Sequence, residues 1–145
     1  MQEHLDRLKY LVQVMPSKLY LISPEDFSFK SSNTKWSKKE ILGHLLDSAT
    51  NNHHRFVRAQ IEDNPSISYD QEMWNKVNRY QELDINHIIN FWVAYNNHLL
   101  FILESMSSEA AEKVCWVGAD SFTLKEFAID YVRHLEHHLK QIVDY

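Results

Sequence analysis

Only two glycines and three prolines interrupt this chain of 145 residues. A fold built from many strands needs frequent turns, and glycine and proline are the residues that turns use most. So few breaks favour long helices over a many-turned β-fold. Hydrophobic residues make up 44% of the chain. A chain of this length can bury a stable core without disulfides or structural metal ions. We predict a single all-α domain that covers residues 1–145.

The charge and the cysteine content restrict the partners and the compartment. The formal net charge is -5 at pH 7, whereas a nucleic-acid surface would need a basic stripe. No apolar run approaches the roughly 20 residues of a membrane span. The only cysteine, Cys115, excludes an internal disulfide, and Met1 leads into a charged amphipathic segment unlike a signal peptide. We expect a cytoplasmic protein that binds neither nucleic acid nor membrane, with Cys115 as a small buried hydrophobe.

Apolar residues recur at three- and four-residue steps in four segments, as they do in amphipathic helices. Ser37 followed by Glu40 is a capping-box pattern at the start of the second segment, and Asp84 can cap the third. Pro16 removes a backbone donor inside the first segment, so a kink or break is expected there. The predicted helices cover residues 2–22, 37–62, 84–106 and 123–145, which together predict a four-helix bundle.

The segments between these helices are short. Residues 23–26 end the first helix, and residues 28–35 are predicted to form a polar loop. Residues 67–79 are aromatic and predict a packed connector or a one-turn helix between the second and third helices. Before the last helix, a helical turn over residues 107–113 is expected to lead into an extended strip at 114–117 with a turn at 118–120, although a loop fits nearly as well.

The last predicted helix carries a histidine pair, His134 and His138. Residues four apart lie one above the other on a helix, so both imidazoles can aim at a common point. Two nitrogens fixed in this way are half of a transition-metal site. The chain has nine histidines, so this spacing alone fits a chance pair of surface histidines as well as it fits a metal site. The zinc-protease motif is absent, since Leu135 follows His134 where that motif has a glutamate.

The remaining ligands would come from elsewhere in the chain. His53 on the second predicted helix and His98 on the third are rival third ligands, and His44 could instead be a bonded histidine at the edge of the core. Asp130 precedes His134 by four residues and could orient its imidazole. A polar ridge follows the second helix at three- and four-residue steps and consists of His44, Asp47, Ser48, Asn51 and Arg55.

Several motifs, taken in order, resemble the DinB/YfiT-like superfamily. They are Trp36-Ser37-Lys38-Lys39-Glu40-Ile41-Leu42-Gly43-His44-Leu45-Leu46-Asp47-Ser48, then Arg55-Phe56, Tyr69-Asp70 with Trp74, and finally His134 and His138. The resemblance implies a four-helix bundle that binds a divalent metal, commonly zinc or nickel, through three histidines. Carried over by position, the ligands are His44, His134 and His138. The last helix of such proteins is richer in histidine, and Glu136 and Gln141 stand here in some of those places.

Three protein nitrogens leave a coordination position open, which is typical of a catalytic metal site. A metal in such a site lowers the pKa of a bound water or thiol. The resemblance implies an enzyme that transfers a low-molecular-weight thiol cosubstrate to a small-molecule electrophile. Asp47, Arg55 and Asp70 are the candidate catalytic groups of its pocket.

Two alternatives remain open at this point. A metal-dependent hydrolase would use the same parts, and a bundle that binds a metal or small ligand without turnover would need no general base. The resemblance also implies a homodimer, for which Trp92 and Tyr95 are candidate residues that extend beyond a single core.

Overall fold

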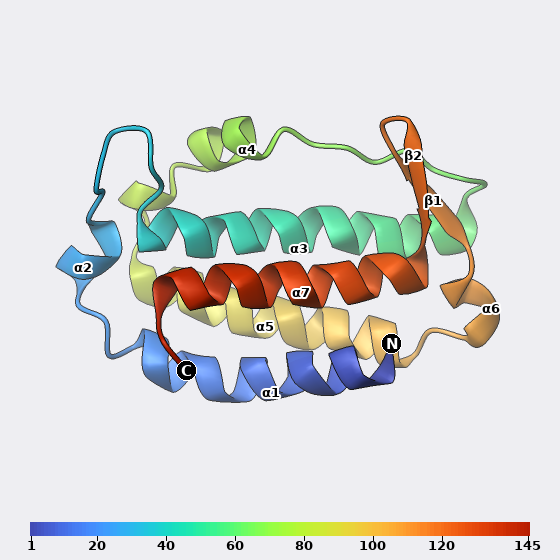
Figure 1. The fold of residues 1–145 in the computed structure, drawn as a ribbon, viewed down its shortest axis with the longest axis horizontal. Coiled ribbons are helices and arrows are strands. Elements are labelled where there is room, and N and C mark those ends of the chain that lie inside the picture. Colours follow the sequence, from blue (N-terminus) through green and yellow to red (C-terminus); the bar gives the residue numbers. More distant parts are fainter.

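The computed structural model describes all 145 residues and contains four long helices. In Figure 1 these helices run side by side along the longest axis of the molecule. Helix α3 packs against α5 and α7, and α1 closes the bundle by packing against the same two helices. Their bounds are α1 (Gln2–Leu19), α3 (Lys38–Ile61), α5 (Ile85–Glu104) and α7 (Leu124–Ile142). The predicted all-α four-helix bundle is confirmed.

Each long helix turns an apolar stripe toward a common core. Leu8, Leu45, Trp92 and Leu135 represent the four helices there, and all four are fully buried. Burying one such side chain contributes about 1.5–3 kcal/mol, so the stripes are the main force that holds the helices together. The expectation that Trp92 extends beyond the core is wrong, because the aligned stripes of four helices enclose its ring completely. The homodimer stays a prediction.

Side-chain caps fix where the long helices begin. At α3, the Ser37 hydroxyl accepts a hydrogen bond from the Glu40 amide at 3.1 Å, and the Glu40 carboxylate accepts one from the Ser37 amide at 2.8 Å. The predicted capping box is therefore present. Thr123 and Glu126 form a second capping box at α7, and Asp84 caps α5 as expected. These bonds satisfy amides that would otherwise lack partners in the first turn.

The first part of the chain corrects two predictions. Of the kink or break expected at Pro16, the break does not occur, since α1 continues to Leu19. Pro16 lies in the last turn, where its missing donor costs at most one helical bond, and burial of Met15 and Leu19 on either side favours another turn. Residues 23–26 do more than end a helix: Ser23 caps the short helix α2 (Pro24–Ser28), with Pro24 at its first position.

The connectors hold more structure than expected. Residues 67–79 contain α4 (Gln71–Asn78), which is longer than the predicted single turn and is followed by a 3-10 turn, η1 (Tyr80–Glu82). The predicted turn after α5 is α6 (Ser108–Ala111). The expected extended strip is β1 (Val114–Val117), which pairs with a second strand, β2 (Asp120–Thr123), in an antiparallel hairpin. Asp120 begins that strand and is not part of the turn, which Gly118 makes in the left-handed region at φ 63°.

The hairpin stands at the opposite end of the bundle from α2 (Figure 1). Its first strand also touches the loop after α3 through a single bridge between Ser66 and Trp116. Cys115, on the same strand, is fully buried and joins the hydrophobic core, as predicted. Burial raises the pKa of its thiol. None of the helices combines the length and the apolar character that a membrane crossing requires.

Gly43 lets the 3-10 turn approach α3 closely. A Cβ atom at this position would lie only 2.2 Å from Cδ2 of the Tyr80 ring. Arg79 stands just before the turn in the left-handed region, at φ 53°, and so redirects the chain toward Gly43. The tyrosine ring thereby lies against the backbone of α3 at Gly43, and its hydroxyl reaches Asp47.

Gly43→Ala should therefore lower the free energy of unfolding by about 1–3 kcal/mol, the usual cost of overpacking. An alanine at an unobstructed helical position would instead raise it by about 0.5–1 kcal/mol, so the sign of the change is diagnostic. The measurement is urea unfolding followed by circular dichroism. His54→Ala on the exposed side of the same helix is the control, with a change within about 0.5 kcal/mol. Unchanged or increased stability in Gly43→Ala would contradict the close packing.

Candidate metal centre

Three histidines converge where α3 packs against α7. His44 lies in the second turn of α3, and His134 and His138 lie one turn apart on α7. One ring nitrogen of each falls within 4.8 Å of the others. The Nε2 atoms of His44 and His134 are 3.2 Å apart. Two nitrogens bound to a tetrahedral zinc at about 2.1 Å would be about 3.4 Å apart, so this spacing suits a shared metal.

Neighbouring side chains fix the directions of these imidazoles. The rings of His134 and His138 meet edge to face with centroids 4.5 Å apart, and the Trp36 ring packs on His44 at 4.9 Å. Nδ1 of His138 lies 3.0 Å from the Gln141 side-chain oxygen, which can accept a hydrogen bond from Nδ1–H and leave Nε2 free for a metal. Gln141 therefore supports the candidate site. No pattern in the sequence indicates this role.

The electrostatic setting keeps the three imidazoles neutral. Burial lowers the pKa of His44 to about 3 and that of His134 to about 4, and neighbouring histidines add to both shifts. Burial also lowers the pKa of His138. A metal binds the neutral imidazole, so these ligands need not lose a proton near neutral pH. The three nitrogen donors suit a divalent transition metal such as zinc or nickel.

The rival histidines lie apart from this cluster. His53 and His98 pack against each other with ring centroids 5.2 Å apart, and Nδ1 of His53 is 3.0 Å from the Tyr95 hydroxyl. These contacts belong to the packing of α3 against α5. Asp130 is exposed, and the buried Nδ1 of His134 has no hydrogen-bond partner. Asp130 therefore does not orient that ring by a hydrogen bond.

Asp47 lies one helical turn from His44 and is almost fully buried, with 2% of its surface exposed. Its Oδ1 atom accepts hydrogen bonds from the Tyr80 hydroxyl at 2.6 Å and from the Asn78 amide at 2.8 Å. Its Oδ2 atom is buried without a protein partner. Burial raises the pKa of Asp47 to about 6, although the two hydrogen bonds oppose this rise. Sequence reasoning missed Tyr80 and Asn78, because nothing local links them to α3.

The other two candidate catalytic residues have different surroundings. Arg55 is buried on α3 and donates hydrogen bonds to the Ile67 carbonyl at 3.1 Å and to the Asn52 side chain at 3.3 Å. Its guanidinium lies 4.8 Å from the centroid of the Phe127 ring, so it braces the α4 connector and α7 against α3. Asp70 is exposed, and its carboxylate caps α4 by accepting from the Met73 amide at 3.0 Å. The structure thus places Asp70 at a helix start.

The pKa shifts predict how the stability of the metal-free protein depends on pH. In the unfolded chain, His44 and His134 gain protons near pH 6.5, whereas in the folded chain they stay neutral to about pH 3 and pH 4. The unfolded state therefore binds more protons in this window, and the free energy of unfolding falls as the pH drops from 6.5 toward 4. Asp47 opposes this trend between pH 3.8 and about 6, but one carboxyl acts against two imidazoles.

Urea midpoints of metal-free protein at neutral pH and at about pH 5 would measure this loss. His44→Gln removes one of the two imidazoles, so its urea midpoint should fall clearly less between neutral pH and about pH 5 than the midpoint of wild type. His87→Gln, at an exposed position on α5, is the matched control and should keep the wild-type drop. An equal drop in His44→Gln and wild type would contradict the burial of a neutral His44.

Comparisons with known proteins agree with this fold. The family model of the DinB superfamily matches residues 1–142. A protein of Halalkalibacterium halodurans named "putative metal-dependent hydrolase" is 23% identical over 137 residues, which cover 90% of this chain and 80% of that protein. YfiT from Bacillus subtilis, a probable metal-dependent hydrolase with an unusual four-helix bundle topology, superposes with a TM-score of 0.83 at 19% identity, covering 98% of this chain and 85% of that one.

The mycothiol-dependent maleylpyruvate isomerase also superposes, with a TM-score of 0.80 at 15% identity over 97% of this chain. This chain spans 60% of the length of that protein. At such identities the two solved structures show a shared fold alone. The family match extends over almost the whole chain and agrees with the motifs found in the sequence, so this chain belongs to the DinB superfamily.

Proposed function

We propose that this protein is a metal-dependent enzyme that holds zinc or nickel through His44, His134 and His138. The observation that carries the proposal is the convergence of three imidazole nitrogens within 4.8 Å. Relatives named as metal-dependent hydrolases support a metal-dependent activity. Three protein ligands also leave a position open for a water or substrate atom, as catalytic sites do and structural sites do not.

A divalent metal, when bound, supplies Lewis acidity that lowers the pKa of an adjacent water or thiol. The residues of the chain supply the metal ligands, the general base and the positioning contacts. Asp47 accepts the proton that the nucleophile loses, because its Oδ1 is held by Tyr80 and Asn78 while its Oδ2 is free of protein partners. A carboxyl with a pKa of about 6 can both take up and return a proton near neutral pH.

The reaction we propose is the transfer of a low-molecular-weight thiol to a small electrophile. The thiol loses its proton to the base, its sulfur bonds to the electrophilic carbon, and the leaving group departs. A protein of the same fold is a mycothiol-dependent isomerase, and this favours a thiol over water as the cosubstrate. Arg55 acts as a positioning residue that holds the connector and α7 in place, and we assign no chemical step to Asp70.

Hydrolysis is the second candidate, since an activated water would use the same ligands and the same base. The names of two relatives favour it. The third is a bundle that binds a metal or small ligand without turnover. These three candidates share the metal site and differ only in the chemistry that occurs after the metal has bound.

The metal content is the first property to measure. Tag-free wild-type protein should contain about one zinc or nickel ion per chain by elemental mass analysis. His44→Ala, His134→Ala and His138→Ala should each lose most of it, because two imidazoles without the third bind a metal far more weakly. His53→Ala and His98→Ala remove a similar pair outside the cluster and should keep the metal. Metal that is indifferent to His44 would rule out this ligand set.

Activity assays on metal-loaded protein separate the candidates. A transferase should consume a small electrophile only when a low-molecular-weight thiol is present. Asp47→Asn should reduce that rate about 100-fold or more while keeping the metal, since it removes a general base and no ligand. Turnover that does not depend on thiol would replace the transferase by the hydrolase. If no electrophile or ester is turned over, the binding protein becomes the better description.

A further inference from the structure

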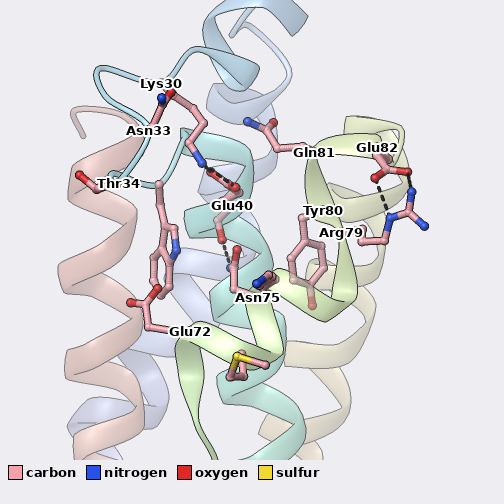
Figure 2. A pocket seen from close by; sticks show the side chains of 13 residues that line it. Lys30, Asn33, Thr34, Glu40, Glu72, Asn75, Arg79, Tyr80, Gln81 and Glu82 are labelled. Atoms are coloured by element: carbon pink, nitrogen blue, oxygen red, sulfur yellow. Dashed lines mark hydrogen bonds and ion pairs between the residues drawn. The ribbon is translucent and has the colours of Figure 1, made fainter.

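A cavity of about 550 Å³ opens beside the metal centre, between the loop after α2, the start of α3, α4 and η1. Ligand sites commonly measure about 300–1,000 Å³, so this cavity suits a small molecule. Figure 2 shows that mostly polar side chains from these four segments surround it, among them Lys30, Glu40, Glu72 and Gln81. Its walls therefore favour a polar occupant.

Two aromatic residues belong both to the cavity wall and to the surroundings of the metal centre. Trp36 lines the cavity and packs on the His44 ring with centroids 4.9 Å apart. Tyr80 also lines the cavity, and its hydroxyl donates to Asp47 at 2.6 Å. A molecule in the cavity is thus separated from His44 and from Asp47 by a single side chain in each case.

Most of the charges on the cavity wall are already paired. The Lys30 ammonium lies 3.0 Å from the Glu40 carboxylate, and Arg79 pairs with Glu82, as the dashed lines in Figure 2 show. Glu72 and Lys76 are the exceptions, since neither makes an ion pair or a side-chain hydrogen bond within the protein. They are four residues apart on α4, and so present one negative and one positive group on the same side of that helix.

We propose that this cavity binds a small zwitterion of the amino-acid type, with its ammonium toward Glu72 and its carboxylate toward Lys76. The zwitterion is either a free substrate or the polar part of the thiol cosubstrate. This inference rests on the proposed function for its biological meaning, but the binding itself requires no metal. Both charges are exposed, so each contact contributes only about two- to fivefold to the affinity, and weak binding is expected.

The test uses L-serine, which carries both charges and no thiol, with metal-free wild-type protein and ligand-observed NMR. Two analogues each lack one charge: ethanolamine has no carboxylate, and 3-hydroxypropionate has no ammonium. Glu72→Gln should weaken L-serine and ethanolamine about two- to fivefold and leave 3-hydroxypropionate unchanged. Lys76→Gln should weaken L-serine and 3-hydroxypropionate and leave ethanolamine unchanged. Glu104→Gln and Lys9→Gln, which change exposed charges away from the cavity wall, should change none of the three.

A protein-observed spectrum locates the binding. L-Serine should shift the indole N–H signal of Trp36, which is assigned from its loss in Trp36→Phe. The proposal is overturned if L-serine does not bind at tens of millimolar, if both cavity variants affect all three compounds equally, or if the Trp36 signal does not respond. Because metal content is measured separately, a missing metal site would leave this result intact, and a failed serine titration would leave the metal site intact.

Discussion

The lengthwise packing of α3 against α7 is the contact on which the rest of the structure depends. It aligns two apolar stripes, and at one level of that seam it brings an imidazole from α3 opposite two from α7. Core packing therefore sets the distances between the three nitrogens, and no flexible loop is involved. A site built on helices has its side chains positioned before a metal binds, at the cost of one buried and two half-buried imidazoles that must stay neutral.

The residues around Asp47 hold its carboxylate in place. Gly43 makes room for the Tyr80 ring, the left-handed Arg79 turns the chain toward it, and the tyrosine hydroxyl then reaches the carboxylate. The connector between α3 and α5 thus fixes the surroundings of Asp47, the general base that we propose. Its packing saturates one carboxylate oxygen and leaves the other available, which is a suitable arrangement for moving a proton.

The sequence predicted the four helices well because their signal is local: apolar periodicity and the Ser37 and Asp84 caps lie within each segment. His44, by contrast, was chosen over His53 and His98 only through the family resemblance, since helical spacing does not say which helix faces which. Tyr80, Asn78 and Gln141 were missed for the same reason, because their contacts depend on tertiary packing. The helix does not break at Pro16, because the effect of a proline depends on how near it lies to the helix end. Strand β2 was missed because it has only four residues, and one apolar residue among three polar ones shows no alternation.

The burial of Cys115 has a consequence for chemistry that involves small thiols. It is the only sulfhydryl of the chain, its side chain is buried in the core although the residue belongs to the hairpin strand β1, and burial raises its pKa. Small thiols and disulfides exchange with protein sulfur only through an accessible thiolate. The folded protein therefore offers no sulfur of its own for mixed-disulfide formation. If the thiol transfer that we propose is correct, the protein can work at high thiol concentrations without forming a mixed disulfide with that thiol.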